Sequence, residues 1–241
     1  MQERAASVFS ALIVGVCILA GLAALGYLLG KAAIDFRQME RTVTVKGLSE
    51  REYPADIVIW PLQFTEASND LGALYTRLDE ITDKIRRFLR ERGVQPAEIS
   101  VSPPSIVDKS AQPYSSGGNN DFRYTATQTV TVYSTQVDNV RGLMNELGEL
   151  GREGIVFTGN DYMARTEYLF NRLNDVKPEM IEEATTKARE VAEKFAADSN
   201  SRLGKIRTAS QGQFTINDRD SNNPHIKNVR VVSTVEYYLS D

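Results

Sequence analysis

The longest apolar run of the chain lies at its amino-terminal end, where residues 5–30 carry no charged side chain. A helix needs roughly 20 apolar residues to cross the hydrocarbon core of a bilayer. A cleaved signal peptide usually has a shorter apolar segment, of about 7–15 residues. The length therefore predicts an uncleaved transmembrane anchor within residues 1–36, while the small residues at Lys31-Ala32-Ala33 leave cleavage open as an alternative.

A short linker, residues 37–40, precedes a region 41–241 in which the apolar pattern changes. Apolar and polar residues alternate in several segments, as they do in half-buried strands. Turn residues separate these segments, and the loop 108–120 contains Gly117-Gly118 and is expected to be mobile and dispensable for folding. The predicted strands are Arg41–Gly47, Tyr53–Thr65, Glu98–Val107, Phe122–Ser134, Ile155–Ala164, Lys205–Thr215 and Ile226–Leu239.

Three segments show a helical period instead. Asn69 or Asp70 is placed to cap a helix that runs to about Arg92 and that Gly93 closes. A second helix is marked by Val137, Val140, Met144 and Leu147, and a long helix is expected from Asn171 to about Ser199, with Met180, Ala184, Val191 and Phe195 facing inward. Strand pairs followed by helices, with hairpins between, predict an α+β fold with mainly antiparallel sheets covered by helices, rather than a doubly wound parallel sheet.

Charge narrows the range of partners. The charges in residues 1–36 cancel, so the net charge of -4 belongs to the remainder of the chain. A mildly acidic domain without a basic stripe argues against nucleic acid as a partner. Basic residues after the apolar run, compared with Arg4 before it, favour a cytoplasmic domain, although long domains also cross membranes despite such flanking charge. These basic residues are Lys31, Arg37, Arg41 and Lys46.

Few residues suggest catalysis. His225 is the sole histidine and lies in a polar turn, where we expect it to be exposed to solvent rather than to act as a base. The sole cysteine, Cys17, lies inside the apolar run, so the folded region has no thiol. We expect no catalytic residue, no cofactor and no metal site, and therefore not an enzyme.

Carboxylates raise the question of a cation site at two places. Asp218, Asp220 and Asn222 have the spacing that opens a calcium loop. Asn223 stands where the turn glycine belongs and Val229 where the bidentate glutamate belongs, so a solvated hairpin loop is the preferred interpretation and a cation site is left open.

The second place is the acidic face of the long helix, which carries Glu182, Glu183, Glu190 and Glu193. We interpret Glu183–Lys187 and Glu190–Lys194 as ion pairs one helical turn apart rather than as parts of a metal site. Anion contacts are conceivable at Arg51, Arg123 and Tyr124.

Several segments, taken in order, resemble the SIMPL domain family of bacterial envelope and secreted proteins, over roughly residues 41–240. The opening pattern usually places Asp directly after Pro, whereas Ala55 separates Pro54 from Asp56 here. The matching segments are Val45-Lys46-Gly47, Tyr53–Ile59, Tyr124-Thr125-Ala126 with Thr129–Val132, Ala184 with Lys187-Ala188 and Val191-Ala192, and Leu203-Gly204-Lys205-Ile206.

This resemblance implies a two-part α+β domain, export from the cytoplasm, ring- or channel-like homo-oligomers in some members, and an association with oxidative-stress tolerance. It supplies no catalytic residues. With the thiol-free composition, it favours a domain on the periplasmic or extracytoplasmic side over the local charge count.

Three functions remain: an anchored homo-oligomeric scaffold, a module that binds a peptide or another envelope component, and, third, a hydrolase. Small residues in the apolar run favour the first, because they let helices approach closely in a membrane. Gly26 and Gly30, and Ala20 and Ala24, are the predicted helix contacts, and Ala11 and Gly15 repeat the spacing. The expected partners are further copies of the chain and the lipid around the helix.

Overall fold

The computed structural model describes residues 2–38, 41–111, 122–158 and 165–240, and within the first segment the side chains of residues 15–34. The chain forms two compact units that interleave in sequence. Unit 1 consists of Met1–Ser49, Pro178–Phe214 and Arg230–Asp241, and unit 2 consists of Glu50–Lys177 and Thr215–Val229. The predicted α+β class with antiparallel sheets is confirmed.

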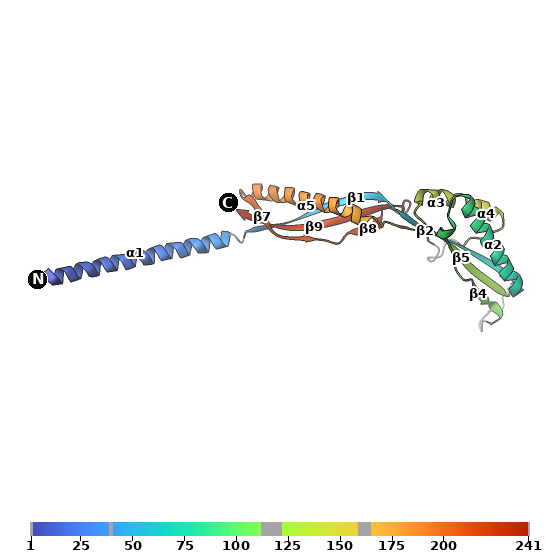
Figure 1. The fold of residues 1–241 in the computed structure, drawn as a ribbon, viewed down its shortest axis with the longest axis horizontal. Helices are drawn as coiled ribbons and strands as arrows, with labels where there is room; N and C mark the ends of the chain where they lie inside the picture. Colours follow the sequence, from blue (N-terminus) through green and yellow to red (C-terminus); the bar gives the residue numbers. More distant parts are fainter. Residues whose placement is uncertain (1, 39–40, 112–121, 159–164, 241) are drawn as a thin grey trace. The chain divides into compact units, whose positions relative to one another are not determined.

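The folded part of unit 1 is a sheet with one long helix on it (Figure 1). Its strands are β1 (Thr42–Pro54), β9 (Ile226–Ser240) and β7 (Arg202–Gln211), in the spatial order β1-β9-β7. Buried and exposed residues alternate along β1 and β9, so one sheet face is covered. The covering helix is α5 (Leu173–Asp198), whose Ala188 and Ala192 share a core with Val45, Val235 and Tyr237.

The inward face of α5 differs from the prediction. Met180 and Ala184 are buried as expected, but the buried stripe continues through alanines, and Val191 and Phe195 remain 36% and 55% exposed. The physical reason lies at Gly47 of β1, where an added Cβ would lie 1.8 Å from the Ala184 carbonyl oxygen and 2.5 Å from the Ala188 nitrogen. The backbones of helix and strand touch, so only small side chains fit between them.

Unit 2 is a second antiparallel sheet with the order β3-β5-β2-β6, in which β4 also pairs with β5. Its central pair, β2 (Ile57–Ser68) and β5 (Tyr124–Ser134), runs in register from Val58 opposite Ser134 to Ser68 opposite Tyr124. The shorter strands are β3 (Ile99–Val101), β4 (Ser105–Asp108) and β6 (Glu167–Leu169). The fourth strand of the β1-β9-β7 sheet is β8 (Thr215–Asp218), which pairs with β9.

Large side chains form the core of unit 2. The helix α2 (Leu71–Glu91) turns its apolar face onto the sheet, where Leu74, Leu78 and Ile85 are almost fully buried together with Phe64 of β2. As predicted, Asp70 caps α2, because its side chain accepts a hydrogen bond from Ala73 N at 2.7 Å. Gly93 follows the helix with a φ of 91°, a conformation that suits glycine.

Several predicted boundaries are wrong for identifiable reasons. β1 runs on through Pro54, and β2 begins at Ile57 rather than at Tyr53. The segment Glu98–Val107 is divided into β3 and β4, since Pro103 and Pro104 lack the amide hydrogen that a ladder needs. The segment Lys205–Thr215 is likewise divided, with β7 ending at Gln211 and β8 beginning at Thr215.

The remaining differences concern the middle of the chain. The second helix is split into α3 (Val137–Met144) and α4 (Gly148–Arg152). The strand expected at Ile155–Ala164 is represented by a single bridge between Phe157 and Phe64, and residues 159–164 lie outside the described part. Of the loop 108–120, residues 109–111 form a 3-10 turn and residues 112–120 are also outside the described part.

Candidate functional site

The amino-terminal helix is the first candidate for a functional element. The helix α1 spans Gln2–Gln38, and its segment Gly15–Ile34 is long and apolar enough to cross a membrane. Every described side chain of that segment is exposed, including Cys17. Apolar side chains on all sides of a helix require an apolar environment, so the segment suits a membrane anchor or a signal sequence.

The four predicted contact residues of α1 lie on two faces of the helix. At 3.6 residues per turn, Gly26 and Gly30 fall on one face, and Ala20 and Ala24 fall on another, roughly 120° away. A Cβ added at Gly26 or Gly30 would have no neighbour within 4 Å in a single chain. These glycines therefore serve no packing purpose inside the described part of one chain.

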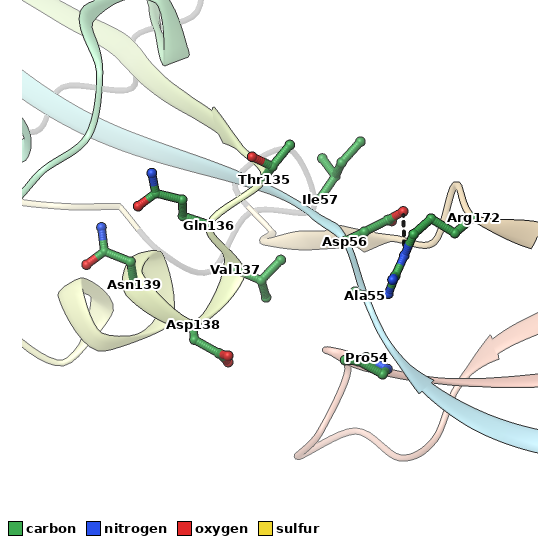
Figure 2. Close-up of a pocket in the computed structure, with 10 residues that line it drawn as sticks. All are labelled: Pro54, Ala55, Asp56, Ile57, Thr135, Gln136, Val137, Asp138, Asn139 and Arg172. Atoms are coloured by element: carbon green, nitrogen blue, oxygen red, sulfur yellow. Dashed lines mark ion pairs between the residues drawn. The ribbon is translucent and has the colours of Figure 1, made fainter. Parts of the chain in front are cut away.

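The second candidate is a depression of about 650 Å³ in unit 2, at the break between β1 and β2 (Figure 2). Three segments bound it: the break between the strands, the turn that leads from β5 into α3, and Arg172, which follows β6. Its lining residues are Pro54, Ala55, Asp56, Ile57, Thr135, Gln136, Val137, Asp138, Asn139 and Arg172.

Asp56 organises this depression. Its two carboxylate oxygens accept hydrogen bonds from the Asn171 backbone nitrogen at 2.9 and 3.1 Å, and Oδ2 lies 3.6 Å from Arg172 Nε. Its own backbone nitrogen donates to the Leu169 carbonyl at 2.9 Å. Asp56 thus fixes the chain after β6 against the start of β2, and its side chain is only 18% exposed.

The Arg172 side chain is 55% exposed and lies at the edge of the depression, with its guanidinium 5.9 Å from the centre of the Phe170 ring. Gln136 and Asn139, which also line the depression, lie on the opposite side from Arg172 in Figure 2. Hydrogen-bond donors and acceptors above a partly apolar floor can hold a polar ligand such as a peptide backbone.

The comparison with known families gives one match. The profile of the SIMPL family, described as a protein of unknown function (DUF541), matches residues 43–235. The chain belongs to the SIMPL family. None of the curated proteins matches the chain.

Packing explains several landmarks of this SIMPL chain. Gly47 sits where helix α5 touches β1, opposite Ala184 and Ala188. Gly204 of β7 lies beside β9 at an irregularity in their pairing, where an added Cβ would be 2.9 Å from the Tyr238 carbonyl oxygen. These small residues therefore allow close approach of backbones, and Asp56 marks the depression in unit 2.

His225 is less exposed than the sequence predicted. Its backbone oxygen accepts a hydrogen bond from Ala55 N at 2.8 Å, and its ring lies edge-on to that of Tyr168, with 6.1 Å between centroids. Burial lowers the pKa of the imidazole below its usual value, and nearby Arg141 lowers it further. The interpretation as a solvent-exposed turn residue is corrected, because the ring is half-buried in unit 2.

The carboxylates weighed for calcium already have protein partners. Asp218 pairs with Lys227, whose side chain is 9% exposed. Asp220 accepts hydrogen bonds from Arg219 and from both nitrogens of Asn223, and these bonds lower its pKa to about 2. Cation binding at this turn would have to break those pairs. In the described residues, no three histidine, cysteine, aspartate or glutamate side chains gather as a metal site would require.

Most of the other charged candidates have partners, but the predicted Glu190–Lys194 ion pair is not found among the described residues. Glu183 pairs with Lys187 as predicted, and it also accepts a hydrogen bond from the buried Ser49 hydroxyl at 2.8 Å. Glu193 pairs with Arg189. Arg123 binds both oxygens of Asp108, which holds the pKa of that carboxyl well below its usual range.

Arg123 also stacks on the Tyr124 ring, 4.8 Å from its centroid. Its guanidinium is therefore engaged within unit 2 rather than presented to an anion. Arg51 too has an interaction within the protein. The sequence missed the depression at Asp56, since nothing in its pattern links Arg172 or residues 135–139 to that aspartate.

Proposed function

We propose that the chain is a membrane-anchored scaffold that forms homo-oligomers, with its folded units on the extracytoplasmic side. The observation that carries the proposal is that every described side chain of residues 15–34 in α1 is exposed. A surface of this kind is stable when lipid or other copies of the helix cover it. The proposed role requires no catalytic residue.

The two small-residue faces of α1 support an assembly of more than two copies. Gly26 and Gly30 allow one close helix contact, while Ala20 and Ala24 allow another on a different face. A helix in a dimer needs one contact face, whereas a helix in a closed bundle touches two neighbours. The two faces are therefore suited to a bundle.

Anchoring strengthens weak contacts between the folded units. Residues 37–40 are a short connection between the apolar helix and β1. Copies held in one membrane share an orientation and a high local concentration, so contacts that are weak in solution gain avidity. An envelope role, including tolerance of oxidative stress, is consistent with the family resemblance and belongs to the proposal.

The assembly is tested with full-length protein in mild detergent, by light scattering coupled to size exclusion. Replacing Gly26 and Gly30 together with leucine should dissociate the oligomer, because the larger side chains keep the helices apart. The same change at Ala20 and Ala24 should dissociate it as well if the second face is used. Leu25→Phe adds bulk on the third face and should leave the mass unchanged.

A wild-type protein that stays monomeric over a wide concentration range would refute the scaffold. Sidedness has a separate test, because a reporter fused after Asp241 should be active only outside the cytoplasm. A reporter active only inside the cytoplasm would reverse the proposed orientation without bearing on assembly.

The depression at Asp56 favours a second function, the binding of a peptide or another envelope component. Its volume and its mixture of amide, carboxylate and guanidinium groups suit a polar ligand. Native mass spectrometry of wild type and Arg172→Ala should reveal a co-purifying ligand in the first and not in the second. Steady turnover of a model ester by pure protein, lost in a depression variant, would instead support the hydrolase.

A further inference from the structure

Unit 1 exposes an apolar pair that its own fold leaves uncovered. Val191 and Phe195 lie one turn apart on α5 and are 36% and 55% exposed, whereas the alanines beside them are buried against the sheet. Large exposed apolar side chains that lie together mark a contact surface more often than isolated ones do. The position of this pair within unit 1 indicates which surface it contacts.

The pair lies at the end of unit 1 where the fold begins. Phe195 is within one turn of the end of α5, and the next turn is held by Ser201 N donating to the Ala196 carbonyl at 2.8 Å. Arg41 Nη2 donates to the Ser201 hydroxyl at 3.1 Å, and the Arg41 carbonyl accepts from Leu239 N at 2.8 Å. The carboxyl end of α5 and residue 41 are therefore neighbours.

Residue 41 cannot move far from the apolar segment of α1. That segment ends at Ile34, and even a fully extended chain from residue 34 to residue 41 spans at most about 25 Å. This upper limit on the distance applies whatever conformation the intervening residues adopt. If α1 is inserted in a membrane, this end of unit 1 stays close to the bilayer surface.

The charge at this end is balanced. Lys194, Arg202 and Lys205 are exposed near the carboxyl end of α5 and along the beginning of β7, and they offset the exposed Glu190, Glu193 and Asp198. By contrast, unit 2 carries the whole excess of negative charge of the chain. Basic side chains near a membrane are attracted to anionic lipid headgroups, and acidic ones are repelled.

We propose that Val191 and Phe195 insert into the headgroup region of the membrane that holds α1, while Lys194, Arg202 and Lys205 contact anionic lipid phosphates. The proposal rests on the membrane anchoring proposed above and adds a second attachment. An aromatic side chain flanked by basic residues is typical of a protein surface that lies in the membrane interface. Two attachments fix the tilt of unit 1 relative to the membrane, whereas a single attachment does not.

The test uses full-length protein with Cys17→Ser, in nanodiscs of phosphatidylcholine alone or of equimolar phosphatidylcholine and phosphatidylglycerol. Phe195→Cys carries an environment-sensitive fluorophore, and nitroxide lipids report its contact with the bilayer. Tyr75→Cys is the matched control, because Tyr75 is a 46% exposed aromatic residue on helix α2 of unit 2.

The label at position 195 should show blue-shifted emission and at least twice the nitroxide quenching of the label at position 75. Quenching should be stronger with phosphatidylglycerol, and charge reversal of Lys194, Arg202 and Lys205 should remove that dependence. Equal quenching at the two positions would overturn the proposal. So would an emission shift that follows the number of copies per disc and not the lipid, since the pair would then contact a second copy.

A label at Leu25→Cys, on the face of α1 away from both predicted helix contacts, separates this inference from the anchor on which it rests. Strong quenching at position 25 without quenching at position 195 refutes the second attachment and leaves the anchor in place. Absence of quenching at position 25 refutes the anchor, and the second attachment fails with it.

Discussion

Helices α2 and α5 each cover one face of an antiparallel sheet, yet they do so by opposite means. α2 fills the space above its sheet with leucine, isoleucine and phenylalanine side chains. α5 instead brings its backbone against β1 through Gly47, Ala184 and Ala188. The first contact depends on side-chain volume and the second on its absence, so the same kind of substitution should have opposite consequences in the two units.

The largest expected effect is the loss of volume in unit 2. Phe64 is fully buried between the sheet and its helices, so Phe64→Ala should lower the free energy of unfolding by about 3–5 kcal/mol. Trp60, the sole tryptophan and part of the same core, reports this unfolding through its fluorescence in urea. A loss below about 1 kcal/mol would show that the core of unit 2 tolerates cavities and would weaken the contrast.

A gain of volume should be the harmful change in unit 1. Gly47→Ala places a Cβ against the α5 backbone and should cost about 1–3 kcal/mol. Hydrogen exchange should accelerate in β1 and α5 while the emission of Trp60 stays unchanged. Gly142→Ala is the control, because a Cβ there meets no neighbour within 4 Å in helix α3, and it should stabilise by roughly 0.5–1 kcal/mol.

Polar contacts in unit 2 should contribute less than its apolar core. Asp56→Asn removes the charge that accepts from Asn171 and attracts Arg172, and should lower stability by about 1–2 kcal/mol in the same urea titration. Asp83→Asn, at an exposed ion pair of 3.9 Å on α2, should stay within about 0.5 kcal/mol of wild type. Equal effects of the two changes would mean that Asp56 does not hold the depression together.

The smallest effect concerns pH. Burial lowers the pKa of folded His225 below the usual 6.5, so the unfolded chain binds the proton more readily. Stability should therefore be complete above pH 6.5 and should decline as the pH falls below that value. Urea titrations at several pH values should show this decline in wild type and less of it in His225→Gln. A steeper decline in the variant would contradict the assignment.

How far sequence patterns predict this molecule depends on which of the two packing modes applies. The α2 interface was predicted well, because Leu74, Leu78 and Ile85 repeat with the helical period and all are buried. The prediction for the α5 interface was correct for Met180 and Ala184 and wrong for Val191 and Phe195. The large apolar side chains of the last two suggested that they face inward. The alanine stripe becomes recognisable only once Gly47, far away in sequence, is placed beneath it.

The contacts of the candidate site were also beyond what a local sequence pattern predicts. Asp56 was noticed through the family resemblance, but its partners Asn171 and Arg172 follow it by more than a hundred residues. No local period connects such positions, because β6 brings them together by pairing with β2. The apolar span of α1, by contrast, is a local property of composition and was predicted from sequence alone.

The order of strands in unit 1 has a consequence for biosynthesis. β9 lies between β1 and β7, although it follows every other described strand in the chain. β1 therefore has no sheet neighbour until the ribosome has made residues 226–240, and non-local pairing of this kind forms slowly. Until those residues are made, unit 1 lacks its central strand, and its unpaired β1 stays accessible to chaperones or to a translocation channel that threads extended polypeptide.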